Sequence, residues 1–126
     1  MKKVAILQIE DDAMSAELMQ YILEKEWPEY DVQNASNANE GLEIARKRNP
    51  DLILVDWSLP DMVGPKVVDQ IKTDDKLKHI PVMLLMGKVD PLKPIEWKFE
   101  PDAFMHKPVH VPDFLECVQQ LLNIDG

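Results

Sequence analysis

One short run, Leu52 to Asp56, constrains the fold of this chain more than any other stretch. Its four successive branched apolar residues predict a strand buried on both faces, because a half-exposed strand alternates apolar and polar side chains. Asp56 follows where this strand would leave the core, at the carboxyl edge of a parallel sheet. Ligands bind at that edge in open α/β sheets. The run therefore predicts an α/β fold with a functional carboxylate at the edge of its sheet.

The rest of the chain alternates between strand-like and helix-like patterns. We expect strands at 3–9, 30–33, 52–55, 81–86 and 103–106, with helices between them and after the last. The first helical pattern has one apolar stripe, the feature of a helix that packs one face on a core, formed by Met14, Leu18, Tyr21 and Ile22. Strict alternation of strand and helix implies a parallel five-stranded sheet with helices on both faces.

The segment 87–101 interrupts this regular pattern. It should contain the fourth helix but carries Pro91, Pro94 and Pro101. A proline inside a helix costs about 3 kcal/mol or more, because it removes a hydrogen bond and clashes with the preceding turn. Only residues 94–99, roughly, can be helical, so we predict a shortened or distorted fourth helix.

Charge and composition exclude several classes of protein. The formal net charge of −9 argues against nucleic acid as a partner, because phosphate backbones are bound by basic surfaces. No stretch is long and apolar enough to span a membrane, and no signal peptide is evident. Cys117 is the only cysteine, so no internal disulfide can form. We expect one cytoplasmic domain over residues 1–126, without an output domain.

Acidic residues end two strands that should be neighbours in the sheet. Glu10 and Asp11 follow the first strand and Asp56 follows the third, so their carboxylates should meet at the carboxyl edge. Carboxylates that close together repel one another, and a hard divalent cation such as Mg²⁺ relieves the repulsion. Lys107, after the fifth strand, can place a positive charge on a phosphoryl oxygen. We interpret Asp56 as a nucleophile that forms an acyl phosphate.

Simpler explanations exist for each of these residues on its own. An acidic cluster before a helix complements the helix dipole, and an aspartate after a strand is often a turn residue. Neither explanation accounts for acids at the ends of strands one and three together with Lys107 and Pro108 at the end of strand five.

Taken in order, these segments resemble the receiver domain of two-component response regulators over essentially the whole chain. Residues 6–12 are similar to its opening strand and acidic pair, 50–64 to its phosphoacceptor strand and loop, and 80–85 to its fourth strand. Lys107 and Pro108 are similar to its lysine and the cis proline that follows. The resemblance implies a three-layer, flavodoxin-like (βα)5 fold with strand order 2-1-3-4-5.

The resemblance also implies roles for individual residues. Asp56 would be phosphorylated, Asp11 would ligate Mg²⁺ directly, and Glu10 would ligate it through water. Ser58 would offer its backbone carbonyl to the metal. Lys107 would pair with the phosphoryl group.

One position departs from the family pattern. Where the family has Thr or Ser at the end of strand four, this chain has Met86, which cannot donate a hydrogen bond to the phosphoryl group. Gly87 keeps the small residue that leaves room for that group. The switch aromatic on strand five is Phe104, which has no hydroxyl. Phosphorylation at Asp56 should therefore survive, while the conformational response should weaken.

Three functions are compatible with these features. In the first, the chain accepts a phosphoryl group from a histidine kinase or phosphotransfer protein. It then signals to a downstream protein through the face formed by the fourth helix, fifth strand and last helix, and is no enzyme beyond its own phosphorylation and dephosphorylation. The second is a degenerate receiver that binds partners independently of phosphorylation. The third, a Mg²⁺-dependent aspartyl-phosphate phosphatase, normally needs an acid where this chain has Ser58.

Overall fold

The fold is seen in a computed structural model that describes residues 3–87 and 98–122. Five parallel strands form one sheet in the order β2-β1-β3-β4-β5, which confirms the predicted order. The strands are β1 (Ala5–Ile9), β2 (Asp31–Ala35), β3 (Leu52–Asp56), β4 (Val82–Met86) and β5 (Ala103–His106). Each lies within three residues of its predicted position at both ends.

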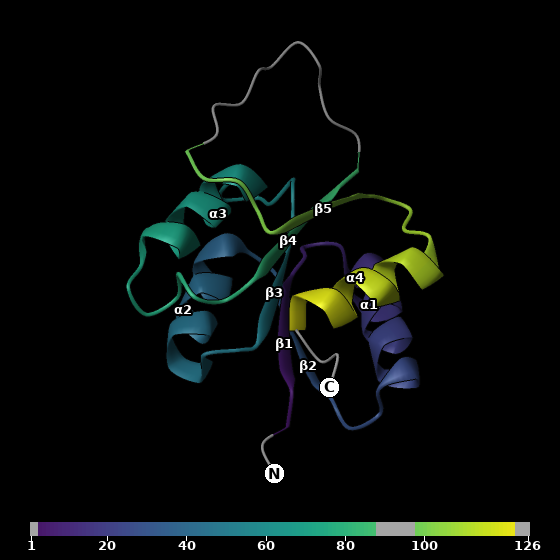
Figure 1. Ribbon diagram of the computed structural model, residues 1–126. Coiled ribbons are helices and arrows are strands. Elements are labelled where there is room, and N and C mark those ends of the chain that lie inside the picture. Colours follow the sequence, from purple (N-terminus) through teal and green to yellow (C-terminus); the bar gives the residue numbers. More distant parts are fainter. Residues whose placement is uncertain (1–2, 88–97, 123–126) are drawn as a thin grey trace.

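Helices cover both faces of this sheet, as the alternating pattern predicted. They are α1 (Ala13–Glu26), α2 (Ala38–Arg48), α3 (Gly64–Thr73) and α4 (Val111–Leu122). Figure 1 shows α2 and α3 on one face and α1 and α4 on the other, so the three-layer prediction is confirmed. None of the helices described is long and apolar enough to cross a bilayer.

The sheet separates two apolar cores. Every residue of β3 is buried, in agreement with its unbroken apolar sequence. Side chains of β3 alternate between the two sides: Ile53 and Val55 pack towards α2 and α3, whereas Leu52 and Leu54 pack towards α1 and α4. Asp56 therefore ends a strand that is buried along its whole length and lies between β1 and β4.

The predicted apolar stripe of α1 is wrong for three of its four residues. Met14, Leu18 and Tyr21 are 80%, 60% and 61% exposed, whereas Ile22 is partly buried and packs against the core as predicted. The residues that α1 buries are Ala16, Met19 and Leu23. Both sets recur at helical spacing because α1 carries apolar side chains on two faces, and the face with the small Ala16 packs on the sheet. An apolar stripe is left at the surface of this helix.

Other local signals act as expected. Asn37 caps α2, with its side chain accepting a hydrogen bond from the Glu40 N–H at 2.8 Å. Pro112 lies in the first turn of α4, where its missing N–H has no cost. Of the predicted remnant of a fourth helix at 94–99, residues 94–97 lie outside the described residues, and the two that are described, Lys98 and Phe99, are not helical.

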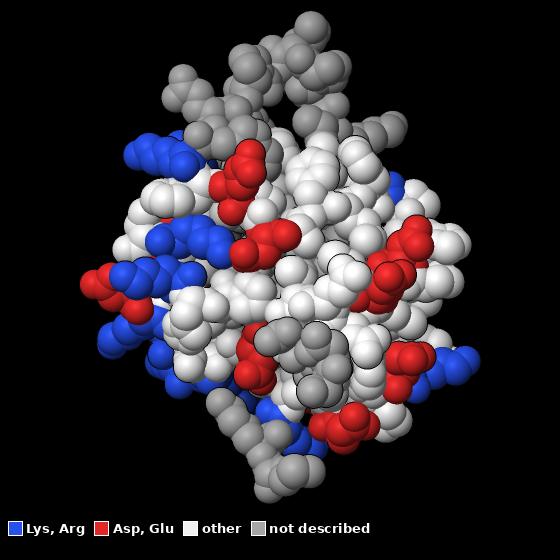
Figure 2. Space-filling model, viewed as in Figure 1, with Lys and Arg blue, Asp and Glu red and all other residues white. Residues whose placement is uncertain are grey.

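Lys and Arg side chains gather over α2 and α3, on the left of Figure 2, while acidic side chains are spread across the view. Several of the basic residues are already paired. Arg46 of α2 lies 2.9 Å from Asp74, and Lys72 of α3 lies 2.6 Å from Asp102. These pairs tie α2 and α3 to the segments beside them, so much of the local positive charge is neutralised within the chain.

Candidate functional site

Three carboxylates meet at the carboxyl edge of the sheet, as predicted. Oxygen atoms of Glu10, Asp11 and Asp56 all lie within 4.8 Å of one another. The parallel pairing of β1 with β3 causes this, because it aligns Ile9 with Val55 and so brings the residues that follow them together. Glu10 and Asp56 are only 6% and 8% exposed, whereas Asp11 faces solvent. The cluster thus has two buried acids and one that is open to an incoming group.

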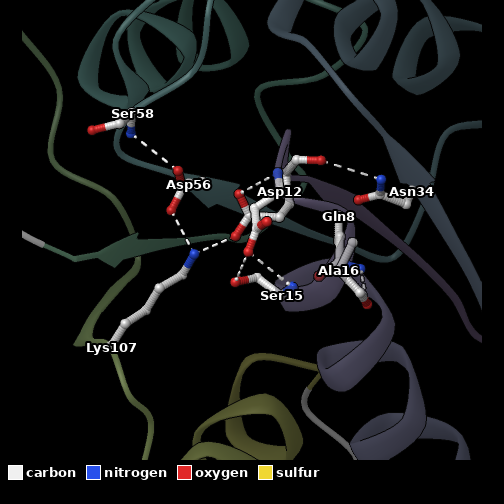
Figure 3. Close-up of polar contacts among 9 residues, drawn as sticks. Gln8, Asp12, Ser15, Ala16, Asn34, Asp56, Ser58 and Lys107 are labelled. Atoms are coloured by element: carbon white, nitrogen blue, oxygen red, sulfur yellow. Dashed lines mark hydrogen bonds and ion pairs between the residues drawn. The ribbon is translucent and has the colours of Figure 1, made fainter.

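Lys107 reaches this cluster from the end of β5 (Figure 3). Its Nζ lies 2.8 Å from Asp56 Oδ1 and also pairs with Glu10 Oε1. Its own N–H donates to the Met86 carbonyl at 2.6 Å, so its backbone is fixed to the end of β4. The peptide bond between Lys107 and Pro108 is cis, as the resemblance implied.

Burial and charge shift two pKa values in the site. Burial raises the pKa of Glu10, and the nearby charge of Asp56 adds to the rise, although the hydrogen bond from Lys107 opposes it. Burial alone would lower the pKa of Lys107, but its hydrogen bonds with Asp56 and Glu10 outweigh burial and raise it. Lys107 is therefore held in its charged form between two carboxylates.

The loop after Asp56 is folded tightly against the end of β3. The Ser58 N–H donates to Asp56 Oδ2 at 3.2 Å, and Ser58 forms an isolated antiparallel bridge with Val63. The Gly64 N–H donates to the Trp57 carbonyl at 2.6 Å. A Cβ on Gly64 would lie 2.8 Å from the Asp56 carbonyl oxygen and 2.9 Å from Trp57 Cα. Only glycine permits this close approach, which fixes the loop that carries Ser58.

Asp61, in the same loop, has a role that the sequence did not indicate. Its two carboxylate oxygens accept hydrogen bonds from the N–H groups of Ala38 and Asn39, at 2.8 and 2.9 Å. These bonds satisfy two free donors at the start of α2. Asp61 therefore joins the loop after Asp56 to the first turn of α2.

A second set of residues missed by sequence reasoning lies beside the acidic turn (Figure 3). The Gln8 side chain donates to the Ala16 carbonyl at 2.9 Å, and the Asn34 side chain donates to the Glu10 carbonyl at 3.2 Å. Asp12 caps α1 and accepts hydrogen bonds from the N–H and the hydroxyl of Ser15, at 3.2 and 2.7 Å. Asp12 is thus occupied at the helix terminus rather than in the carboxylate cluster.

The donor set suits a hard divalent cation. Mg²⁺ takes oxygen ligands, usually one or two carboxylates with water or phosphate oxygens at the other positions. The cluster offers carboxylate oxygens alone, and the solvent-facing side of Asp11 leaves room for such further ligands. Glu10, Asp11 and Asp56 therefore fit Mg²⁺ in ligand type and in spacing.

The expected switch residues, Met86 and Phe104, lie on the neighbouring strands β4 and β5. Met86 is partly buried and packs against the core beneath α2 and α3. It pairs with His106 in the sheet, and Leu84 pairs with Phe104. Phe104 is 45% exposed and contacts the His106 ring edge-on, with ring centroids 5.6 Å apart. An added Cβ at Gly87 would meet no atom of the described residues within 4 Å, so space is open beside the site.

Comparison with known proteins gives one consistent result. Residues 6–119 match the family described as the response regulator receiver domain. The polar-differentiation response regulator DivK of Brucella anthropi is 31% identical over 122 residues, which cover 94% of this chain and 96% of DivK. The signal receiver domain of a histidine kinase from Syntrophus aciditrophicus is 30% identical, with a TM-score of 0.83, and the match covers 94% of this chain and 89% of that one. A putative response regulator from Chloroflexus aurantiacus, 23% identical, has the same fold with a TM-score of 0.85 over 97% of this chain and 99% of its own.

Proposed function

Because this chain belongs to the family of response regulator receiver domains, we propose that Asp56 accepts a phosphoryl group from a histidine kinase or phosphotransfer protein. Receiver domains are signalling modules that interact with such donors and with downstream proteins. The observation that carries the proposal is the contact of Lys107 with Asp56 beside the acidic pair Glu10 and Asp11. That arrangement provides a nucleophile, metal ligands and a cation in one place.

In the proposed reaction, an Asp56 carboxylate oxygen bonds to phosphorus as the bond to the donor's histidine nitrogen breaks, and that nitrogen leaves with the bonding electrons. Lys107 and the Ser58 N–H hold one carboxylate oxygen each, so the carboxylate is oriented before the donor arrives. After transfer, Lys107 is placed to bind a phosphoryl oxygen in place of Asp56 Oδ1. Mg²⁺ held by Glu10, Asp11 and Asp56 would neutralise charge on the phosphoryl oxygens.

The exposed stripe of α1 provides a docking surface for the donor. A groove of about 640 Å³ runs between α1 and the segment after β5, and is lined by Leu18, Tyr21, Val109, Gly87 and Lys107, among others. Its lining is mainly apolar, and it shares Lys107 and the open space at Gly87 with the site. We assign it to an apolar helical face of the phosphodonor, because a donor seated there lies next to Asp56.

A specific observation also supports the second candidate function, a receiver that signals independently of phosphorylation. Met86 offers no hydroxyl to a phosphoryl oxygen, and the chain has no Ser or Thr after Thr73. Thr73 itself is occupied, since its hydroxyl donates to the Asp69 carbonyl at 2.7 Å. Phosphorylation and the conformational response are therefore separate questions for this chain, and they need separate measurements.

The phosphorylation step is tested with acetyl phosphate and Mg²⁺, followed by the mass of the intact protein. We expect the mass of one added phosphoryl group, lost in Asp56→Asn and when Mg²⁺ is chelated. Asp51→Asn is the matched control, because Asp51 is a partly buried acid at the opposite edge of the sheet that accepts the Ala5 N–H at 2.8 Å. An added phosphoryl group that persists in Asp56→Asn would refute the assignment.

The docking surface is tested separately, with a panel of autophosphorylated histidine kinases as donors. Leu18→Asp together with Tyr21→Asp should slow transfer from the kinases but leave phosphorylation by acetyl phosphate unchanged. Phe99→Asp is the control, because Phe99 is also an exposed apolar residue but lies beside α3, where its N–H donates to Asp69. Equal slowing with both variants would contradict the assigned surface.

A further inference from the structure

Two uncharged amides lie beside the acidic turn Glu10 to Asp12 (Figure 3). Gln8 is buried in β1 and Asn34 is partly buried in β2, and the two are paired in the parallel register of the sheet. The Gln8 side chain points towards Ala16 in the first turn of α1, and the Asn34 side chain points towards the Glu10 carbonyl (Figure 3). In the described part of the chain, both side chains donate to backbone carbonyls rather than to the carboxylates of the site, so their effect on the site must pass through the backbone.

The amides hold the backbone on either side of the turn. Before it, both main-chain groups of Glu10 are fixed by β2: its N–H donates to the Ala35 carbonyl at 2.9 Å, and its carbonyl accepts from Asn34 at 3.2 Å. After the turn, the Ala16 carbonyl accepts from Gln8 at 2.9 Å, while the Ala16 N–H donates to the Asp12 carbonyl, also at 2.9 Å. The backbone that carries Asp11 is thus held at both ends.

The orientation of the Asn34 amide follows from its contact with Glu10. If the amide were turned over, its oxygen would face the Glu10 carbonyl oxygen, and two acceptors would meet. In the observed orientation, Oδ1 is buried and has no hydrogen-bond partner in the described part of the chain. A buried acceptor without a donor destabilises a fold. Asn34 is therefore not the most stabilising residue for its position. It does, however, donate the hydrogen bond that holds the Glu10 carbonyl.

We propose that Gln8 and Asn34 are positioning residues for the Mg²⁺ ligands, acting through the backbone of Glu10 to Asp12. The inference rests on the proposed function, since it concerns the same metal site. Neutral amides are required because Glu at position 8 or Asp at position 34 would lose the donor and add a fourth negative charge beside the cluster. Hydrogen-bonded residues behind metal ligands tune affinity in this way, because they fix the direction of the ligands.

Asn34→Leu separates this role from a structural one. Leucine has a similar size and removes both the donor to Glu10 and the unsatisfied oxygen. We expect its unfolding midpoint in urea, measured without Mg²⁺, to equal or exceed that of the wild type. Its Mg²⁺ affinity, measured by calorimetry with Mg²⁺ alone, should fall by about tenfold, the lower end of the loss on removing such a partner. Asn34→Ala serves the same purpose should the leucine variant not fold.

Gln8→Met tests the other anchor, and we expect it also to weaken Mg²⁺ binding several-fold. Val118→Ala is the control, because it removes apolar contacts from α4 in the same core without touching the turn. The inference is wrong if both amide variants bind Mg²⁺ within twofold of the wild type, or if Val118→Ala loses as much affinity. A wild-type chain that binds no Mg²⁺ would instead refute the proposed metal site, and the inference with it.

Discussion

Lys107 Nζ lies 2.8 Å from Asp56 Oδ1 and pairs at the same time with Glu10, so the two buried acids of the site share one ammonium group, which offsets part of their negative charge. Mg²⁺ would bind the same carboxylates. The lysine and the metal would therefore each reduce the repulsion between Glu10 and Asp56. Replacing Lys107 by Met should make folding depend on the metal. The free energy of unfolding in chelator should fall by about 1.5–3 kcal/mol, the worth of hydrogen bonds to charged groups, and Mg²⁺ should restore part of it.

Urea unfolding of Lys107→Met with chelator and with Mg²⁺ measures this dependence. The variant should also bind Mg²⁺ more tightly than the wild type, because a competing positive charge has been removed. Lys78→Met is the matched control: Lys78 pairs with Asp75 on the surface, 3.0 Å away, and such pairs contribute little. Equal stabilisation of both variants by Mg²⁺ would mean that Lys107 does not compete with the metal.

Gly64 fixes the loop that follows Asp56, so Gly64→Ala should damage both stability and phosphorylation. The new methyl group would meet backbone atoms of Asp56 and Trp57, which cannot move away as a flexible side chain can. Overpacking of this kind costs about 1–3 kcal/mol. Thermal or urea unfolding measures the loss, and the rate of phosphorylation by acetyl phosphate should fall with it.

Gly87→Ala is the contrasting variant, because open space surrounds that glycine among the described residues. Its free energy of unfolding should remain within about 0.5 kcal/mol of the wild type, as for a surface substitution. Similar destabilisation by both alanines would show that loss of glycine itself, rather than the close approach at Gly64, causes the effect.

The main features of the fold were predictable because they follow from periodicity and topology. An unbroken apolar strand and the strict alternation of strands with helices leave few possible strand orders for the sheet. The observed order is the one expected. The carboxylate cluster followed from the same reasoning, since neighbouring parallel strands place the residues after Ile9 and Val55 together. Lys107 was found because it ends the last strand of that sheet.

The orientation of α1 could not be predicted for a physical reason. Met14, Leu18 and Tyr21 recur with the spacing of a buried stripe, and so do Ala16, Met19 and Leu23. The larger residues suggested the first set, but a helix packs closest to a sheet through small side chains such as Ala16, which is buried here. Leu18 and Tyr21 of the exposed set then line the groove beside Lys107. The wrong prediction thus identified two of the residues now assigned to docking.

Long-range contacts by polar side chains were equally inaccessible. Asp61 is 23 residues from Ala38 in the chain, and Asn34 is 24 residues from Glu10. No spacing rule connects such positions, because their meeting depends on the lengths of intervening helices and loops. Asp61 and Asn34 read as ordinary loop or strand residues until the fold shows which backbone groups they contact.

The contact of Asp61 with α2 predicts a pH-dependent contribution to stability. Hydrogen bonds from the N–H groups of Ala38 and Asn39 hold the pKa of Asp61 below its ordinary value of about 3.9. A carboxyl whose pKa is lowered by folding stabilises the protein above its unfolded pKa. That contribution is lost as the pH falls through the lower, folded pKa. Asp61→Ala should therefore cost about 1 kcal/mol near pH 7, the usual worth of a helix cap.

Urea unfolding of wild type and Asp61→Ala at several pH values tests the sign. The difference between them should stay constant from pH 7 to about pH 5 and narrow below about pH 4, as the wild-type carboxyl gains its proton. Asp61→Asn is the control, since it keeps one acceptor but cannot titrate at this position. A difference between Asp61→Ala and wild type that does not change with pH would show that the charge of Asp61 plays no part.

Met86 offers the last test, because it separates phosphorylation from its conformational readout. A hydroxyl at this position would donate to a phosphoryl oxygen, a bond worth about 1.5–3 kcal/mol. Full reversal of a two-state switch needs about 5.5 kcal/mol, so this bond supplies a large share of the coupling. Met86→Thr should therefore enlarge the NMR shifts that beryllofluoride and Mg²⁺ induce at Phe104 and His106. Met86→Val is the control, because valine has the shape of threonine without its hydroxyl, and this variant should respond like the wild type. Equal NMR responses of the Thr and Val variants would show that the missing hydroxyl does not limit the switch.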